Sequence, residues 1–335
     1  FRHCEQSAAI SVARNTPLIR LSQDRRGAMR LAMPGSDRFM VHFVIASEAR
    51  QSLSLRWQFG IDERSELASI HRPSPLVPSM PSSLAAPDQP VVLVEHHDDI
   101  ACVTLNRPAQ MNAVNQALRD LLIPTLNALN HDESVQAIVI TGMGDRAFCA
   151  GQDLAEAAAL QAQTIQPWLS SQRDMYQAVR DLDKPCVAAL NGVTAGAGFQ
   201  IALCADWRMA HPDTRIGQPE VKAGLGSIMG TYLMTLHVGM NHNAQLSLSG
   251  DLITAQRAYE IGLITELTPE DVRAQAVRRA QQLAQRPRTA FRETKRFMRA
   301  LSQPGFDAAA HAGLAAQLAC FESGQPQKAM ARFRK

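Results

Sequence analysis

From about residue 90 onward, short apolar runs alternate with amphipathic segments. Residues 91–95 and 100–105 are apolar runs separated by His96-His97-Asp98-Asp99, a pattern that predicts a β-hairpin. Leucines at helical spacing predict a helix over residues 115–129, and the β-branched content of residues 135–141 predicts a buried strand.

The same alternation continues toward the C-terminus. The pattern predicts strands over residues 186–190 and 207–210 and a helix over residues 198–205. It predicts that the chain after residue 254 is mostly helical. Strands that alternate with helices predict an α/β core with a helical C-terminal region.

The composition changes near residue 88. Residues 1–88 contain no lysine, show no sustained period and end in a proline-rich stretch that reads as a linker. A presequence, a small accessory domain and an upstream artefact of start-site assignment, with Met80 as the natural start, all remain open. We favour the last, and expect a poorly ordered extension over residues 1–88 and one domain over residues 89–335.

Charge and cysteine content narrow the class of function. The chain carries 34 basic and 31 acidic side chains without a basic stripe, which argues against nucleic-acid binding. The six cysteines are widely spaced and lack zinc-ligand spacing, so we expect reduced thiols in a cytoplasmic protein and no metal. Because the longest apolar runs fall short of the roughly 18 residues that span a bilayer, we expect no membrane segment.

Three loops that follow predicted strands carry small residues. They cover residues 147–154, 191–200 and 216–220. Taken singly, each indicates only a tight turn or the start of a helix.

The ordered set of loops, with Asn106-Arg107-Pro108 before it and Leu248-Ser249-Gly250 after it, resembles the enoyl-CoA hydratase/isomerase (crotonase) family. The resemblance covers residues 90–335. It implies a repeated ββα superhelical core with a helical C-terminal region, an acyl-CoA thioester as substrate in fatty-acid metabolism, and a homotrimer or dimer of trimers. Coenzyme A would enter as part of the substrate, with no separate cofactor.

The resemblance also implies an oxyanion hole. In this family two backbone N–H groups stabilise the enolate that forms from a thioester, and they map to Gln152 and Ala197. Ala197 stands where the family usually has glycine, but alanine still offers its N–H. The residues implied to position the ligand are Ala150, Gly151, Gln152, Asp153, Leu154, Gly196 and Ala197.

The acid/base groups implied by the resemblance differ from those of the hydratases. Two glutamates of the hydratases map to Gln200 and Glu220, and a glutamine does not exchange protons near neutral pH. A single acid at Glu220 resembles the double-bond isomerases. Ile228 and Met229 replace the glycine-rich segment that holds water in hydratases, so we expect weak hydration.

Two other functions stay open. One is an enoyl-CoA hydratase in which Gln200 orients water, and the other is a non-catalytic family member that binds CoA or RNA. Basic side chains expected near the CoA phosphates are Arg292, Lys295, Arg296 and those of residues 332–335, and the acyl pocket is expected within residues 156–182.

Overall fold

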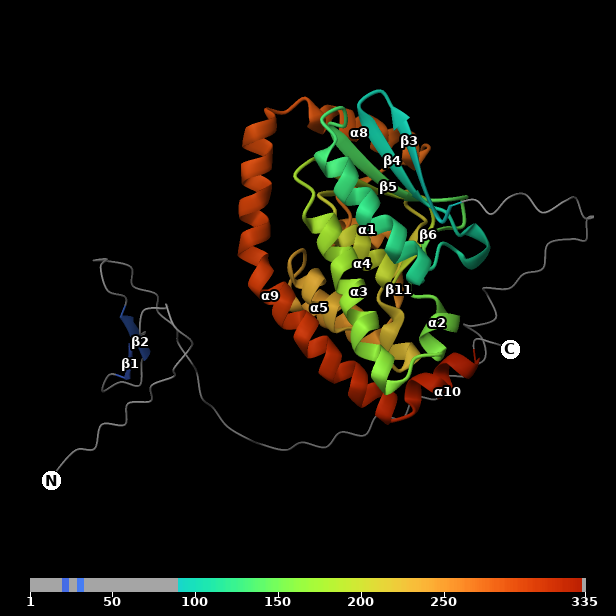
Figure 1. Cartoon of the computed structure of the whole chain (residues 1–335), viewed down its shortest axis with the longest axis vertical. Coiled ribbons are helices and arrows are strands. Elements are labelled where there is room, and N and C mark those ends of the chain that lie inside the picture. The colour runs from blue at the N-terminus through green and yellow to red at the C-terminus, as the bar shows by residue number, and fades with distance from the viewer. Residues whose placement is uncertain (1–19, 24–28, 33–89, 333–335) are drawn as a thin grey trace, which may run out of the picture. The chain divides into compact units, whose positions relative to one another are not determined.

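The computed structural model describes residues 20–23, 29–32 and 90–332 (Figure 1). The chain divides into two units, Phe1–Pro81 and Ser82–Lys335. In the first unit, β1 (Arg20–Gln23) and β2 (Met29–Ala32) pair antiparallel, although the sequence pattern predicted no strand there. The rest of the predicted extension over residues 1–88 lies outside the described residues.

The second unit contains a six-stranded sheet. Its strands, in spatial order, are β12 (Glu266–Leu267), β9 (Trp207–Ala210), β7 (Cys186–Leu190), β5 (Ala137–Gly142), β4 (Ile100–Leu105) and β3 (Val92–His97). Neighbours are parallel except β3 and β4, which form the predicted hairpin. Asp98 turns the hairpin in the left-handed conformation with φ 55°, which a short acidic side chain tolerates.

The second unit also contains a sheet of four short strands. Its spatial order is β11 (Leu252–Thr254), β10 (Arg215–Gly217), β8 (Val193–Ala195) and β6 (Ala147–Cys149). In the chain, β5 is followed by β6, β7 by β8 and β9 by β10, so each of these strands of the large sheet precedes a strand of the small one. Because β6, β8 and β10 run parallel, the three loops that follow them leave the same edge of the small sheet.

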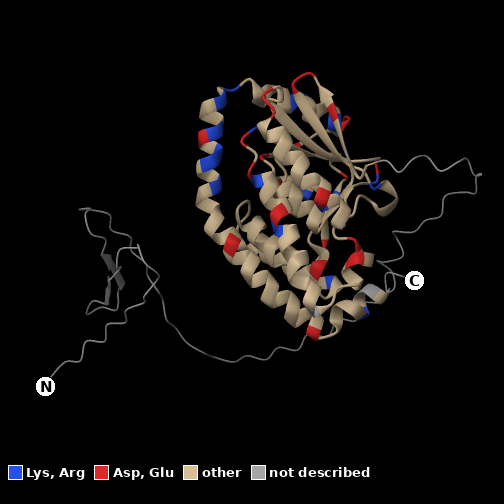
Figure 2. Ribbon diagram, in the orientation of Figure 1, with Lys and Arg blue, Asp and Glu red and all other residues tan. Residues whose placement is uncertain are grey.

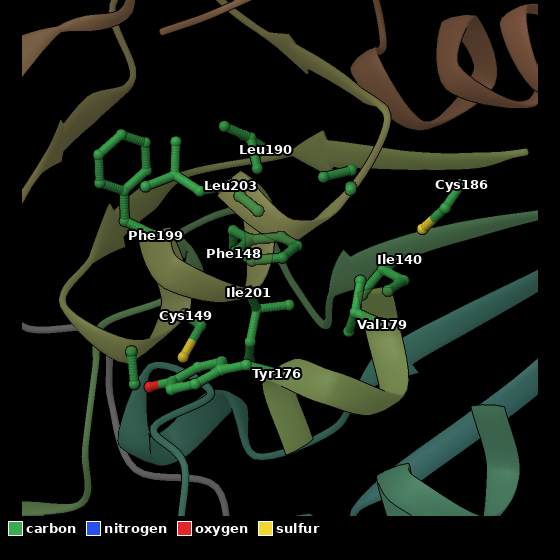
Figure 3. Packing of buried hydrophobic residues seen from close by; sticks show 14 of the residues in the cluster. Ile140, Phe148, Cys149, Tyr176, Val179, Cys186, Leu190, Phe199, Ile201 and Leu203 are labelled. Atoms are coloured by element: carbon green, nitrogen blue, oxygen red, sulfur yellow. The ribbon is translucent and has the colours of Figure 1, made fainter. Parts of the chain in front are cut away.

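Helices cover both faces of the large sheet. The helices α1 (Gln116–His131), α3 (Ala162–Arg180) and α4 (Ala197–Cys204) share one apolar cluster with it, and α8 (Val272–Ala284) packs on the opposite face. Leu118, Leu122 and Leu126 of α1 recur every four residues and are fully buried, as their spacing predicted. Figure 3 shows the centre of this cluster, with Phe148 and Ile201 among its members.

The C-terminal region is helical, as predicted. It contains α5 (Ile228–Thr235), α6 (Met240–Ser249), α7 (Ala255–Glu260), the 35-residue α9 (Arg288–Glu322) and α10 (Gln325–Arg332). Figure 1 shows α9 running along the side of the domain, and it packs against α3 and α5. Among the described residues, no helix combines the length and apolarity needed to cross a membrane.

The cysteines of the described residues are free thiols. Burial raises the pKa of Cys149, Cys186 and Cys204 to about 12, so these thiols stay protonated near neutral pH. Cys149 is fully buried at the end of β6, whereas Cys204 keeps some exposure. The cytoplasmic location inferred from the cysteine pattern stays a prediction.

Candidate active site

The first loop carries Gln152, which lines a cavity. Val114 N–H donates to the Gly151 carbonyl and Asp153 N–H donates to the Val114 carbonyl, both at 2.8 Å. This parallel bridge turns the intervening Gln152 N–H outward, and within the described part of the chain that N–H has no acceptor. Gly151 adopts φ 116°, a conformation in which an L side chain would be strained.

The second loop presents the N–H of Ala197, the first residue of α4. Gly196 precedes it with φ 50° and ψ −123°, a conformation that only glycine adopts without strain. The Ala197 N–H also has no acceptor among the described residues, and it belongs to the positive end of the helix. A Cβ built on Gly151 would lie 3.9 Å from the Ala197 nitrogen, so the two loops are close together.

A third loop brings Glu220 to the same cavity. Glu220 lies in the 3-10 helix η3 (Pro219–Ala223) after β10, and Gln200 Nε2 on α4 donates to its Oε1 at 2.8 Å. A Cβ on Gly196 would lie 3.2 Å from that Oε1, so the missing side chain makes room for the carboxylate. The predicted residues Gln152, Ala197, Gln200 and Glu220 therefore line one cavity of about 500 Å³.

Burial controls the protonation of Glu220. Loss of hydration raises the pKa of its carboxyl from 4.5 to about 7, and hydrogen bonds from its own backbone, Ser227 and Gln200 act in the opposite direction. A carboxyl with a pKa near 7 is present in both forms at neutral pH. It can therefore accept and donate a proton within one catalytic cycle.

Gln218 holds the Glu220 carboxylate by hydrogen bonds, a role that the sequence pattern did not predict. With its amide nitrogen turned toward Glu220, it donates to Oε1 at 2.7 Å and to Oε2 at 2.9 Å. A Cβ on Gly230 would come within 2.5 Å of the Gln218 amide group, so this glycine leaves space for the fully buried amide. The signal available in the sequence was a glutamine two residues before the catalytic candidate.

Asp153 holds the first loop in place. Its carboxylate accepts from Ala155 N–H at 2.9 Å and Glu156 N–H at 3.2 Å, capping α2 (Leu154–Ala158), and pairs with Arg107 at 2.8 Å. Burial raises its pKa, but the Arg107 guanidinium and these N–H groups outweigh burial and lower it overall. Asp153 stays ionised and fixes the loop that carries Gln152.

The structure separates the predicted ligand-positioning residues into two groups. Gln152 and Ala197 line the cavity, whereas Gly151, Asp153 and Gly196 shape the loops around it. Ala150 and Leu154 lie outside the cavity wall, and the Leu154 side chain is 42 % exposed on α2.

Of the basic residues expected near CoA, Arg292, Lys295 and Arg296 do not line this cavity. Lys295 is buried and pairs with Asp206 at 2.6 Å, so its predicted contact with a CoA phosphate is wrong. Arg292 and Arg296 line a different hollow, near the start of α9, where Figure 2 shows a concentration of basic residues. Arg296 there pairs with Asp183 at 2.5 Å. The side chains of residues 332–335 lie outside the described part of the chain.

Apolar side chains form much of the remaining wall. Ile228 and Met229 line the cavity as predicted, together with Trp168 of α3, Leu225 and Leu314 of α9. The predicted acyl region over residues 156–182 contributes α3, but it also contributes polar residues that the sequence analysis missed, namely Gln172 and Tyr176. In the sequence, Trp168, Gln172 and Tyr176 follow one another at intervals of four residues, which places them on the same face of the helix. This spacing was the signal that could have identified them.

Known proteins are similar to this chain over most of the domain. The family described as enoyl-CoA hydratase/isomerase matches residues 95–334. Among relatives, the 2,3-dehydroadipyl-CoA hydratase of Escherichia coli is 34% identical over 62% of this chain and 81% of its own length. The crotonyl-CoA hydratase of Syntrophomonas wolfei is 29% identical over 72% of this chain and 94% of its own.

A solved structure agrees with these sequence matches. An enoyl-CoA hydratase/isomerase from Mycobacterium paratuberculosis superposes with a TM-score of 0.68 at 27% identity, covering 73% of this chain and 98% of that one. Together with the α/β architecture, this confirms the predicted fold class. The chain belongs to the enoyl-CoA hydratase/isomerase, or crotonase, family.

Proposed function

We propose that this enzyme shifts the double bond of an enoyl-CoA, with Glu220 as its single acid/base. The observation that carries the proposal is the pairing of Glu220 with an amide, Gln200, at 2.8 Å instead of with a second carboxylate. A carboxylate next to one amide can move a proton between two carbons, but it lacks the second acid/base used in hydration.

The proposed reaction needs only groups at this end of the cavity. Glu220 takes a proton from C2 of a 3-enoyl-CoA, and the electron pair moves through the developing dienolate onto the thioester oxygen. The N–H groups of Gln152 and Ala197 would stabilise that oxygen. When the electrons return, C4 takes the proton from Glu220, the double bond lies between C2 and C3, and the carboxylate is restored.

The surrounding residues favour proton return over addition of water. Ile228 and Met229 supply apolar surface beside Glu220, and apolar surface both excludes water and raises the pKa of a neighbouring carboxyl. Coenzyme A enters this scheme as part of the substrate.

Initial rates with two thioesters test the proposal. We expect kcat/KM for isomerisation of hex-3-enoyl-CoA to exceed kcat/KM for hydration of crotonyl-CoA by at least ~100-fold, because each proton transfer by a placed group contributes about that factor or more. Faster hydration than isomerisation would contradict the assignment.

Hydration is the second candidate, and the names of relatives favour it, since the proteins from Escherichia coli and Syntrophomonas wolfei are both called hydratases. In that scheme Gln200 would orient a water and Glu220 would perform both proton transfers. The same pair of rate measurements separates the two functions.

We further propose that the chain assembles as a homotrimer or a dimer of trimers. Phe297, Met298 and Leu301 on α9 are each at least 65% exposed, an apolar surface suited to contacts between subunits. Sedimentation at about 10 μM should therefore give three or six times the 36.6 kDa chain mass. A monomer at that concentration would rule out both assemblies.

A further inference from the structure

The cavity contains polar atoms that are buried and have no hydrogen-bond partner among the described residues. They are Gln172 Nε2 and Gln317 Oε1, and beside them the buried Tyr176 hydroxyl and the Gln152 amide interact only with each other. All four residues line the cavity, and Tyr176, Gln172 and Gln317 are more than nine-tenths buried. A buried polar atom that stays unpaired is unfavourable, and a polar group of a ligand could supply the missing partner.

We call the side chains of Gln152, Gln172, Tyr176 and Gln317 the polar strip of the cavity. Gln172 and Tyr176 are four residues apart on α3, so their side chains lie one helical turn apart on the same face. Figure 3 shows Tyr176 at the edge of the apolar cluster with its hydroxyl directed away from Val179. Gln317 comes from α9 across the cavity, where its Nε2 donates to the Gly226 carbonyl at 2.9 Å and leaves its oxygen as an unused acceptor.

The strip begins close to the reaction centre. Burial raises the pKa of Tyr176 well above its ordinary value, and the negative charge of Glu220 raises it further. A hydrogen bond with the Gln152 side chain acts in the opposite direction. Tyr176 is therefore a neutral hydroxyl within electrostatic reach of Glu220 and beside a residue of the proposed oxyanion hole.

Apart from Tyr176, the charged or titratable side chains that line the cavity are Arg173, Glu220, Asp307 and His311. Arg173 of α3 is already paired with Asp307 at 2.9 Å and with Asp174 at 3.0 Å. A carboxylate on the acyl chain would thus meet a compensated cation and a second carboxylate. A hydroxyl or carbonyl group would instead meet amide and hydroxyl groups that can donate and accept.

We propose that the acyl chain of the substrate carries a neutral hydrogen-bonding group, a hydroxyl or a carbonyl, which binds between Tyr176 and Gln172. This proposal rests on the proposed acyl-CoA function of the cavity and specifies its substrate class. The neighbouring Trp168, Leu225 and Leu314 would pack against the hydrocarbon part of the chain.

Calorimetry with saturated thioesters tests this proposal without requiring turnover. We expect 5-oxohexanoyl-CoA to bind the full-length protein about 10-fold more tightly than hexanoyl-CoA, since one satisfied buried pair is worth about 1–1.5 kcal/mol. Tyr176→Phe and Gln172→Leu should each reduce this preference to within about threefold. Gln163→Leu, at an exposed position of the same helix, is the matched control and should preserve it.

Equal or tighter binding of hexanoyl-CoA would overturn the proposal, and tightest binding of hexanedioyl-CoA would overturn its neutral character. A preference that persists unchanged in both cavity variants would show that other residues recognise the polar group. Failure here is distinct from failure of the proposed function, because a protein that isomerises 3-enoyl-CoA can still bind both saturated thioesters equally. A protein with no isomerase activity can equally show the preference.

Discussion

Glu220→Gln should lower kcat for double-bond isomerisation by about 10³-fold, within the range that a positioned acid/base contributes. The substituted amide keeps the size of the side chain and its neighbours Gln200 and Gln218, so KM should change little. The rate of the unaltered enzyme should itself rise with pH through about 7, because proton abstraction needs the ionised carboxylate. The variant's residual rate should lack that rise.

The same substitution should stabilise the fold above neutral pH. Because the folded-state pKa of about 7 lies above the unfolded value of 4.5, the folded protein binds a proton more tightly than the unfolded chain. Stability therefore falls as pH rises from about 4.5 through 7 and stays lower beyond it. Removing the carboxyl should raise the free energy of unfolding at pH 8 by up to about 3 kcal/mol.

Parallel measurements on Glu322→Gln, an exposed glutamate on α9, supply the control. Kinetics from pH 5.5 to 9 and urea unfolding at pH 5 and 8 are the required data. Retention of more than about a tenth of the wild-type kcat in Glu220→Gln would show that another group moves the proton.

Gly196→Ala should lower kcat by about 10²–10³-fold, comparable with the loss of an oxyanion-hole donor. Gly196 holds φ 50° and ψ −123°, and the added methyl would lie 3.2 Å from Glu220 Oε1 and 3.6 Å from the Gly151 Cα. Relief of this crowding requires the second loop or the carboxylate to move. Either motion displaces the Ala197 N–H from Glu220 or from the Gln152 loop.

Gly239→Ala provides the matched control, because a Cβ at Gly239 meets no atom within 4 Å and its φ is −67°. Circular dichroism and thermal unfolding should show that both variants remain folded at the assay temperature. A folded Gly196→Ala enzyme with kcat within about threefold of wild type would contradict the role assigned to this loop.

The order of strands and helices was predictable because local patterns determine it. The hairpin, the helix over α1 and the strand β5 follow from periodicity and β-branched content alone. The pairing of β6, β8 and β10 into a separate sheet was not predictable from these patterns. Strands of three residues have too short a pattern, and their partners are far apart in the sequence.

The site was predictable where chemistry depends on the backbone. Small residues at Gly151 and Gly196 mark loops whose N–H groups must approach a ligand closely, and Glu220 follows from the resemblance. Gln218 and Tyr176 escaped prediction because their roles come from tertiary burial. A glutamine under Glu220 and a tyrosine on α3 have ordinary structural uses, and only the folded chain places them at the cavity.

Lys295 illustrates the opposite error. A lysine among arginines in a C-terminal helix suggested a phosphate contact, but the helix turns this side chain inward to Asp206 and the Lys184 carbonyl. A buried ammonium requires such partners, and it is then unavailable to a ligand. Charge in a sequence does not reveal which side of a long helix faces the core.

Deuterium transfer tests the central claim that one carboxylate moves the proton. With 2,2-dideuterated hex-3-enoyl-CoA in ordinary water, a lone Glu220 should deliver part of the deuterium removed from C2 to C4 of the same molecule. Mass spectrometry and NMR of the 2-enoyl product at low conversion measure that fraction. A product whose C4 proton comes entirely from solvent while C2 has lost deuterium would contradict a single-carboxylate mechanism, as would a protein that forms no 2-enoyl product.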